Sequence, residues 1–169
     1  MCSVTSGKQG VIDVVFDGAV HDNVPQTAHV ERIVRDVLVG EHVSWTHIGI
    51  ILTDHATVTE LNRLWLNHEH DTDVLSFVIE ESDNGLEGEV YVDTQTAAER
   101  HEEFGTSYEM EVLRYVIHGV LHLAGLDDQT AEEQRFMTRL ENRYLECNRP
   151  VMPSSGAAQS EVEHTPESE

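Results

Sequence analysis

At 169 residues, the chain is long enough for one domain with a proper hydrophobic core and would be cramped as two domains. Hydrophobic residues make up 39% of it, as in ordinary globular proteins, and no apolar run approaches the length of a membrane span, so we expect no membrane partner. Ten lysines and arginines stand against 32 aspartates and glutamates, which gives the unusually acidic formal net charge of −22.

The first half of the chain predicts strands and helices in alternation. VIDVVFDG at 11–18 is β-branched and bounded by a turn, which is typical of a strand. Apolar residues recur at helical spacing after Pro25, and Gly40 is predicted to end that helix. THIGIILT at 46–53 predicts a second strand, and Asp54 can cap the helix that follows. The apolar stripe of that helix consists of Val58, Leu61, Leu64 and Trp65.

The next segment predicts a pair of strands and a short helix. VLSFVIE at 74–80 and GEVYVD at 88–93 are strand-like and are separated by the polar loop ESDNG. A short helix is expected from Thr94 to Phe104, where Gly105 ends it.

Two longer helices complete the predicted domain. Ser107 caps a main helix over about 108–124, whose apolar residues leave it little polar face, so we expect it to be buried. Thr130 and Glu133 form a capping box at the start of the last helix.

This order of elements predicts an α+β fold with a small mixed four-stranded sheet and about five helices packed on it. We expect one domain over residues 1–150. Residues 151–169 are rich in proline, serine and glutamate and have little to bury, so they predict a disordered acidic tail.

The sequence HGVLHLAGLDD at 118–128 has the spacing of a helical metal site. His118 and His122 are four apart on the central helix, so both imidazoles project from one face and can reach one ion. Gly125 can take the left-handed conformation that reverses the chain, and Asp128 can then return as a third ligand. Asp127 competes for that role, but the spacing favours Asp128.

Two histidines and a carboxylate are a common catalytic set for a single zinc ion. Three protein ligands leave a position for water, whose pKa the metal would lower until it is a nucleophile near neutral pH. The alternative is that the histidine pair serves packing or the surface. The glycine and the carboxylate at matching offsets favour the metal, because a buried apolar helix has little other reason to hold two histidines.

The residue after the first histidine separates this motif from that of the HExxH peptidases. In those enzymes a glutamate at this position is the general base, whereas here the residue is Gly119. A mid-helix glycine costs about 1 kcal/mol relative to alanine. We therefore expect backbone or substrate to pack closely there, and a metallopeptidase is the weaker interpretation.

These residues resemble the YbeY family, the bacterial metal-dependent endoribonucleases and ribosomal RNA maturation factors. HGVLHLAGLDD is similar to the family signature HGxLHLxGxDH, LNRLWLNHEHDTDVLSF at 61–77 to its second block, and GEVYVD to its next strand. The resemblance covers about residues 11–147. It implies a zincin-like fold and a zinc-dependent nuclease that cuts single-stranded RNA in late 16S ribosomal RNA maturation and ribosome quality control. The implied partners are small-subunit ribosomal RNA and ribosome or ribosome-assembly proteins.

The chain departs from the family pattern at two positions. The third ligand is usually histidine and here is Asp128, which binds zinc well but leaves the metal less positive and its preference altered. An arginine usually follows the aromatic residue of the second block, where this chain has Leu66 after Trp65. The cation that would hold a phosphate, like the general base, is therefore not identified.

Three arginines on the last helix, Arg135, Arg139 and Arg143, lie four apart on one face. They could follow the phosphates of RNA, or they could be a solvated face paired with glutamates. The acidity of the chain favours the solvated face. The glutamates that would serve as partners are Glu132, Glu133 and Glu141.

Other polar residues near the motifs have less specific roles. Glu111 shares the helix face of His118, and we favour a dipole-stabilised charge over a contact with that histidine. Ser76 and Asp73 are expected to form strand-end hydrogen bonds. The remaining histidines are expected at the surface or in ordinary positions, and they include His68, His70 and His101.

A non-catalytic ribosome-assembly factor with a structural metal is the main alternative to the nuclease, because Leu66 and the acidity both weaken the case for RNA cleavage.

The N-terminal stretch shows no export signal, and Cys2 and Cys147 lie near opposite ends of the chain. Both observations predict a cytoplasmic protein without a disulfide scaffold.

The acidity belongs to the predicted domain, because only four of the acids follow Pro150. Lys8 is the single lysine. So large a charge produces self-repulsion that ordinary salt screens only in part. An acidic soluble protein is one interpretation. We favour adaptation to a cytoplasm of very high salt, where screening is nearly complete.

That hypothesis predicts that the free energy of unfolding rises steeply with KCl concentration, because added ions screen the repulsion between carboxylates. Denaturant titrations at increasing KCl measure it. A free energy that stays constant into the molar range would contradict salt adaptation.

Overall fold

The computed structural model describes residues 9–18, 22–65 and 72–149. Its elements follow the predicted order. They are β1 (Gln9–Phe16), α1 (Thr27–Gly40), β2 (Trp45–Thr53), α2 (His55–Trp65), β3 (Val74–Ser82), β4 (Gly85–Asp93), α3 (Thr94–Arg100), α4 (Tyr108–Leu123) and α5 (Ala131–Cys147). The predicted tail at 151–169 lies outside the described residues, as do Cys2, Leu66, His68 and His70.

The four strands form one mixed sheet in the order β1-β2-β4-β3. β2 is parallel to both β1 and β4, with Ile50 opposite Val14 on one side and Val90 on the other. β3 runs antiparallel to β4 along the edge, where Ser76 pairs with Val90. The predicted α+β fold with a small mixed sheet is confirmed.

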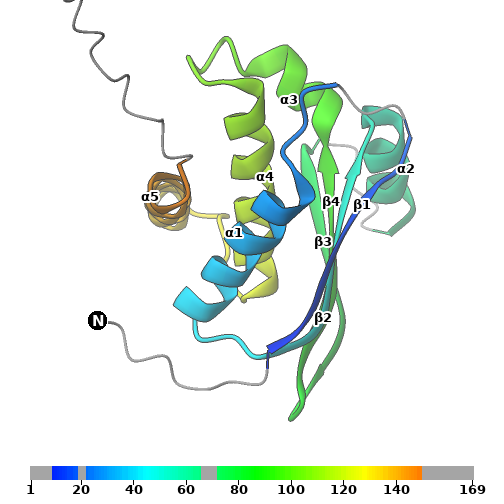
Figure 1. The fold of residues 1–169 in the computed structure, drawn as a ribbon, viewed down its shortest axis with the longest axis vertical. Coiled ribbons are helices and arrows are strands. Elements are labelled where there is room, and N and C mark those ends of the chain that lie inside the picture. The colour runs from blue at the N-terminus through cyan, green and yellow to red at the C-terminus, as the bar shows by residue number, and fades with distance from the viewer. Residues whose placement is uncertain (1–8, 19–21, 66–71, 150–169) are drawn as a thin grey trace, which may run out of the picture.

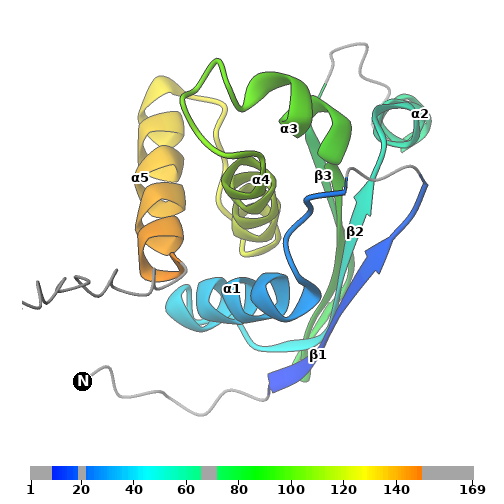
Figure 2. The same ribbon diagram turned by 45° about the horizontal axis from the view of Figure 1, so that its top comes forward.

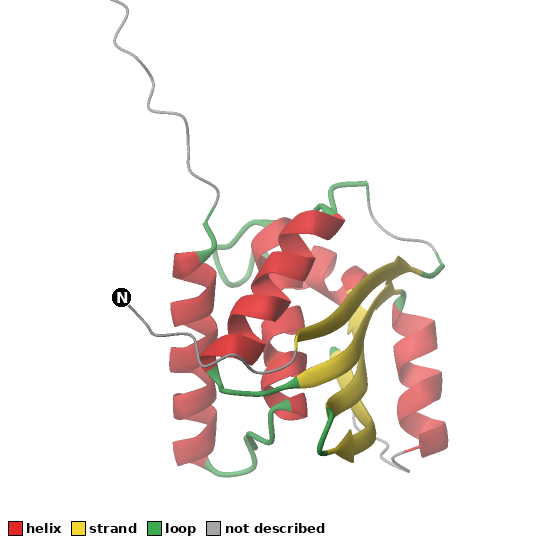
Figure 3. Cartoon of the chain, turned by 60° about the horizontal axis from the view of Figure 1, so that its bottom comes forward, coloured by secondary structure: helices red, strands yellow, loops and turns green. Residues whose placement is uncertain are grey.

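The helices cover the two faces of this sheet unequally (Figures 1 and 2). α1 and α4 pack on one face, α5 lies on the outer side of α4, and α2 lies on the opposite face. Figure 3 shows the same segregation of helices about the strands. The core therefore lies mainly between the sheet and the α1–α4 layer.

The central helix α4 is buried, as predicted. The hydroxyl of Ser107 accepts the backbone N–H of Met110 at 3.2 Å and caps its start. Both charged residues of its first turn are glutamates, which the helix dipole favours. Within the described residues, no helix combines the length and the apolar composition needed to cross a bilayer.

α1 ends at Gly40, as predicted, but this glycine does not itself take the left-handed conformation at the helix end. The left-handed residue beyond it is His42, with φ of 60°. A side chain at position 40 would overlap the hydroxyl of Tyr144 on α5. The glycine therefore permits close packing of two helices, and the phenol of Tyr144 goes on to donate to Glu41 at 2.5 Å.

The β3–β4 connection is tighter than the predicted loop. Both strands extend until Ser82 pairs with Gly85, which leaves Asp83 and Asn84 as a two-residue turn. Gly85 has φ of 128°, a conformation that few other residues adopt. At the next element, α3 ends at Arg100 instead of Phe104, and turns carry the chain to Gly105.

The predicted stripe of α2 is buried only near its start. Val58 is fully buried, whereas Leu64 and Trp65 are 59% and 70% exposed, because α2 covers only part of its face of the sheet. Asp54 caps this helix as predicted. Its carboxylate accepts the backbone N–H of Thr57 at 2.9 Å, and that hydrogen bond lowers the pKa of Asp54.

Candidate metal centre

Helix α4 places His118 and His122 one turn apart on one face. Their ring centroids are 4.5 Å apart, and their Nε2 atoms approach each other to 2.9 Å. The side chains are about a quarter exposed, so the pair lies at the boundary between core and solvent. The spacing seen in the sequence therefore brings two nitrogen atoms to one point.

The turn after α4 returns Asp128 to the same point. The backbone N–H groups of Gly125 and Leu126 donate to the carbonyls of His122 and Leu121, and Gly125 has φ of 90°. This pairing is the Schellman motif that reverses a chain at a helix end. It places one carboxylate oxygen of Asp128 3.5 Å from His118 Nε2 and the other 3.7 Å from His122 Nε2.

Asp127 takes another role. It is exposed, and its carboxylate accepts the backbone N–H of Asp128 at 2.8 Å. It thereby holds the loop that presents Asp128 to the two histidines.

The outer nitrogen of each imidazole is already occupied. Nδ1 of His122 donates to the backbone carbonyl of Leu126 at 2.9 Å, and since a carbonyl can only accept, this nitrogen carries the proton. Nδ1 of His118 lies 2.8 Å from a carboxylate oxygen of Glu141, which fixes that ring in the same way. Both Nε2 atoms therefore lie close to each other and to the oxygens of Asp128.

This donor set fits a zinc ion. Imidazole nitrogens and a carboxylate oxygen are ligand atoms that zinc takes in proteins, and here one atom from each of the three side chains faces the same point. Donor atoms around a tetrahedral zinc are about 3.3 Å apart, given bonds of about 2.0–2.1 Å. The separations of 2.9, 3.5 and 3.7 Å here bracket that value. The three side chains form the cluster of possible metal ligands found among the described residues.

Glu141 is the residue of this site that sequence reasoning missed. It lies on α5 and is buried, and its carboxylate also accepts from the guanidinium of Arg114 at 3.0 Å. The signal was present, because Glu141 stands within the apolar stripe of α5, where a charge needs a partner. That stripe consists of Met137, Leu140, Tyr144 and Leu145.

Arg114 does not supply the free cation that the resemblance to the YbeY family led us to expect near position 66. It lies one turn before His118, but both terminal nitrogens of its guanidinium are engaged, with Glu141 and with the side chain of Asn142. It therefore holds α4 to α5. Position 66 itself lies outside the described residues.

Gly119 is the point where α4 comes closest to the sheet. A Cβ there would overlap Val90 on β4 and lie 2.9 Å from Val74 on β3. The hydroxyl of Ser76 donates to the carbonyl of Gly119 at 2.8 Å. The expected close packing is confirmed, but side chains of the sheet pack there instead of the expected backbone or substrate. Because this position faces the sheet, a glutamate base of the peptidase kind has no room.

The remaining predicted residues have supporting roles. Glu111 is buried and accepts from the hydroxyl of Thr106 at 3.1 Å, and it does not contact His118. Asp73 pairs with Arg100 at 3.1 Å, and burial raises the pKa of its carboxyl more than that cation lowers it. His101 lies 3.0 Å from the backbone carbonyl of Thr106 through its Nδ1, so it stabilises a local turn.

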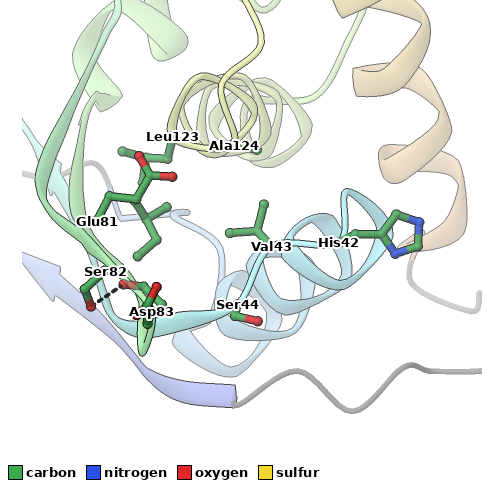
Figure 4. Close-up of a pocket in the computed structure, with 10 residues that line it drawn as sticks. His42, Val43, Ser44, Glu81, Ser82, Asp83, Leu123 and Ala124 are labelled. Carbon is green, nitrogen blue, oxygen red and sulfur yellow. Dashed lines mark hydrogen bonds between the residues drawn. The ribbon is translucent and has the colours of Figure 1, made fainter.

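A pocket of about 360 Å³ lies below the end of α4, and Figure 4 shows it. It is lined by His42, Val43, Ser44, Glu81, Ser82, Asp83, Gly85, Leu86, Leu123 and Ala124. It includes neither histidine of α4, and Glu81 and Asp83 make it unfavourable for a phosphate. The chemistry is therefore better placed at the histidine cluster.

Comparison with known proteins gives a consistent result. A family model described as Endoribonuclease YbeY matches residues 19–148. An endoribonuclease YbeY of Salinibacter ruber is 49% identical over 131 residues, which cover 73% of this chain and 83% of that protein. That of Chloroherpeton thalassium is 33% identical over 134 residues, covering 79% and 94%. The fold is similar to the solution structure of TM1509 from Thermotoga maritima, with a TM-score of 0.54, 27% identity, and coverage of 82% and 89%.

The close approach at Gly119 predicts that Gly119→Ala destabilises the protein by about 1–2 kcal/mol. Because a Cβ at position 119 would meet two valine side chains of the sheet, overpacking should cost about 2–3 kcal/mol, the upper part of its usual range, and the better helix propensity of alanine returns about 1 kcal/mol. Denaturant unfolding measures the change. Gly49→Ala is the control, because a Cβ there lies 3.4 Å from Glu89 Cγ, an ordinary contact. Equal stability of Gly119→Ala and the unchanged protein would show that α4 can move off the sheet freely.

Proposed function

The chain belongs to the YbeY family of endoribonucleases, and on that premise we propose that it hydrolyses single-stranded RNA with the help of one zinc ion. Hydrolytic cleavage of RNA is the activity of the family. The zinc ion and the preference for single strands are the parts that experiment has to test.

The convergence of His118, His122 and Asp128 is the observation that carries this proposal. These three side chains would hold the ion, and each imidazole is oriented by a hydrogen bond on its far nitrogen. A bound zinc ion supplies Lewis acidity and lowers the pKa of a water molecule. The partial exposure of the three side chains lets a phosphodiester reach them from solvent.

Asp128 sets the charge of the site. A carboxylate in place of the usual neutral histidine makes the ligand set one unit more negative, so the bound ion attracts a phosphate less strongly. The enzyme is therefore expected to bind RNA through contacts beyond the metal. No protein side chain is assigned as general base.

The biological role that we propose is late maturation of 16S ribosomal RNA and ribosome quality control. Its partners would be the small ribosomal subunit and ribosome-assembly proteins, in a cytoplasm of high salt. Residues 1–150 would form the catalytic domain and residues 151–169 an acidic tail.

Cleavage of a labelled single-stranded RNA in high KCl with added zinc tests the proposal. We expect His122→Ala to reduce the rate by more than about 100-fold, because the loss of one of three ligands removes the metal chemistry. His47→Ala is the matched control, since His47 pairs with Asp13 on β1 and takes no part in the cluster. A chelator should abolish cleavage by the unchanged protein, and zinc should restore it.

Two results would overturn this view. Equal cleavage by His122→Ala and the unchanged protein would show that the histidine cluster is not the catalytic centre. Zinc binding without cleavage of RNA by the unchanged protein would favour an assembly factor in which the metal is structural.

The contact of Glu141 with His118 yields a second prediction. Glu141→Gln should weaken zinc binding by about 10–100-fold, because a neutral amide orients the imidazole less well and lowers its basicity. Competition with a chelating dye measures affinity without any need for activity.

Two variants separate this effect from a loss of folding. Arg114→Gln removes the other ion pair of Glu141 but leaves the contact with His118, and Glu146→Gln removes an exposed charge from the same helix. Both should bind zinc like the unchanged protein. Unaltered zinc affinity in folded Glu141→Gln would show that Glu141 stabilises only the packing of α5.

A further inference from the structure

The outer face of α5 carries a row of three exposed arginines, Arg135, Arg139 and Arg143. Residues four apart in a helix rise about 6 Å, so the three guanidiniums follow the helix axis at regular intervals. The residues that α5 buries against its neighbours lie on the other side, and α5 is the outermost helix of its layer (Figure 2). The row therefore faces solvent along its whole length.

These three arginines lack the carboxylate partners expected of a solvated face. Within the described ranges, no carboxylate oxygen lies within 4.0 Å of their guanidinium nitrogens, although Arg63, Arg100 and Arg114 each have such a partner.

The expected pairing with nearby glutamates is therefore wrong. Glu133 is used in the capping box with Thr130, and Glu141 is used by His118 and Arg114. Glu132 lies on the same side of the helix as the row but forms no ion pair with it. Among the described residues, Arg32, Arg35 and Arg149 also have no carboxylate partner within 4.0 Å, so the row is distinguished by its regular spacing along one helix face. In a chain with 32 acids, it is a local concentration of positive charge.

Aromatic rings accompany the row. The guanidinium of Arg139 lies over the ring of Phe136 at 5.6 Å, and that ring is 46% exposed. The guanidinium of Arg143 lies over the buried ring of Tyr144 at 5.3 Å. A shallow hollow of about 480 Å³ adjoins them, lined by Ala131, Gln134, Arg135, Thr138 and Arg139. Stacked guanidiniums with free hydrogen-bond donors beside an exposed ring suit a phosphate next to a base.

We propose that the arginine row of α5 binds the backbone of the RNA strand as it continues away from the metal centre, with Phe136 stacking on a base. This inference rests on the proposed function and extends it to the part of the substrate outside the cleavage site. Glu141 connects the two surfaces, because it touches His118 on the inner side of the helix whose outer side carries the row. Their separation is about one helix diameter, 10–12 Å, which a few nucleotides span.

The acidity of the chain restricts where RNA can be held. A net charge of −22 repels a polyanion over most of the surface, so RNA is held only where cations are local and unpaired. The exposed ring of Phe136 favours nucleic acid over an acidic protein, because a nucleic acid has bases that can stack on it. Such stacking is less sensitive to salt than phosphate contacts are. High salt then weakens the phosphate contacts without removing the stacking.

Binding and cleavage of two RNA lengths test the proposal. The double variant Arg135→Gln/Arg139→Gln is compared with Arg35→Gln/Arg63→Gln, which changes the net charge equally on α1 and α2. A long single-stranded RNA reaches both the metal centre and the row, whereas a dinucleotide, with its single phosphodiester, is too short to span the helix diameter of about 10–12 Å and reaches the metal centre alone.

For the long RNA, we expect the row variant to lose about 20-fold in affinity at 0.1 M salt and the logarithmic salt slope to fall by about 1.4, the contribution of two phosphate contacts. Cleavage of the dinucleotide should be unchanged. Phe136→Leu should weaken binding of the long RNA and leave the salt slope as it was. The charge-matched control should change none of these quantities.

Three outcomes would overturn the assignment. Equal affinity of the row variant and the unchanged protein for the long RNA would remove the row from the binding surface. Binding of polyglutamate through the same arginines as tightly as RNA would assign the row to an acidic protein. Equal losses in the charge-matched control would show a general charge effect. Failure to cleave either RNA would instead count against the proposed function, while the affinities would still test the row.

Discussion

The contact of α4 with the sheet at Gly119 fixes the position of everything else at the candidate site. The absence of a side chain lets the helix backbone approach Val74 and Val90, and the hydroxyl of Ser76 holds the carbonyl of Gly119 from the strand side. With one side of α4 fixed in this way, the preceding residue, His118, projects from another side of the helix toward α5. The sheet therefore positions the helix, the helix positions the imidazoles, and α5 completes the site with Glu141.

The features that sequence predicted correctly depend on local spacing. A helical repeat places His118 and His122 together, a left-handed Gly125 reverses the chain, and Ser107 caps α4, all within one continuous stretch. Backbone geometry determines such relations without help from the rest of the fold. The fold class was equally accessible, because the order and periodicity of the elements restrict how they can pack.

The features that sequence missed depend on which surfaces meet. The sequence correctly placed the end of α1 at Gly40, but it missed the close contact of this glycine with the hydroxyl of Tyr144, more than a hundred residues away. The partner of His118 is chosen by the packing of α5 on α4, and no local rule names Glu141. The arginines of α5 were expected to pair with glutamates, but Glu133 is used in the capping box that the sequence itself predicted, and Glu141 has partners that only the tertiary structure reveals. In each case the sequence shows that a buried or crowded group needs a specific neighbour, but it does not show which residue that neighbour is.

All three candidate ligands come from eleven consecutive residues, and this locality determines how a bound ion would act on the fold. Closing a loop this short takes little chain entropy, so an ion there gains little by restricting the unfolded chain. Its stabilising effect would be concentrated in the last turns of α4 and in the loop after Gly125. Loss of the ion would then release the helix end as a small cooperative unit, while the sheet and α1 keep their packing. The centre would stabilise one helix terminus locally, unlike zinc sites that join distant parts of a chain.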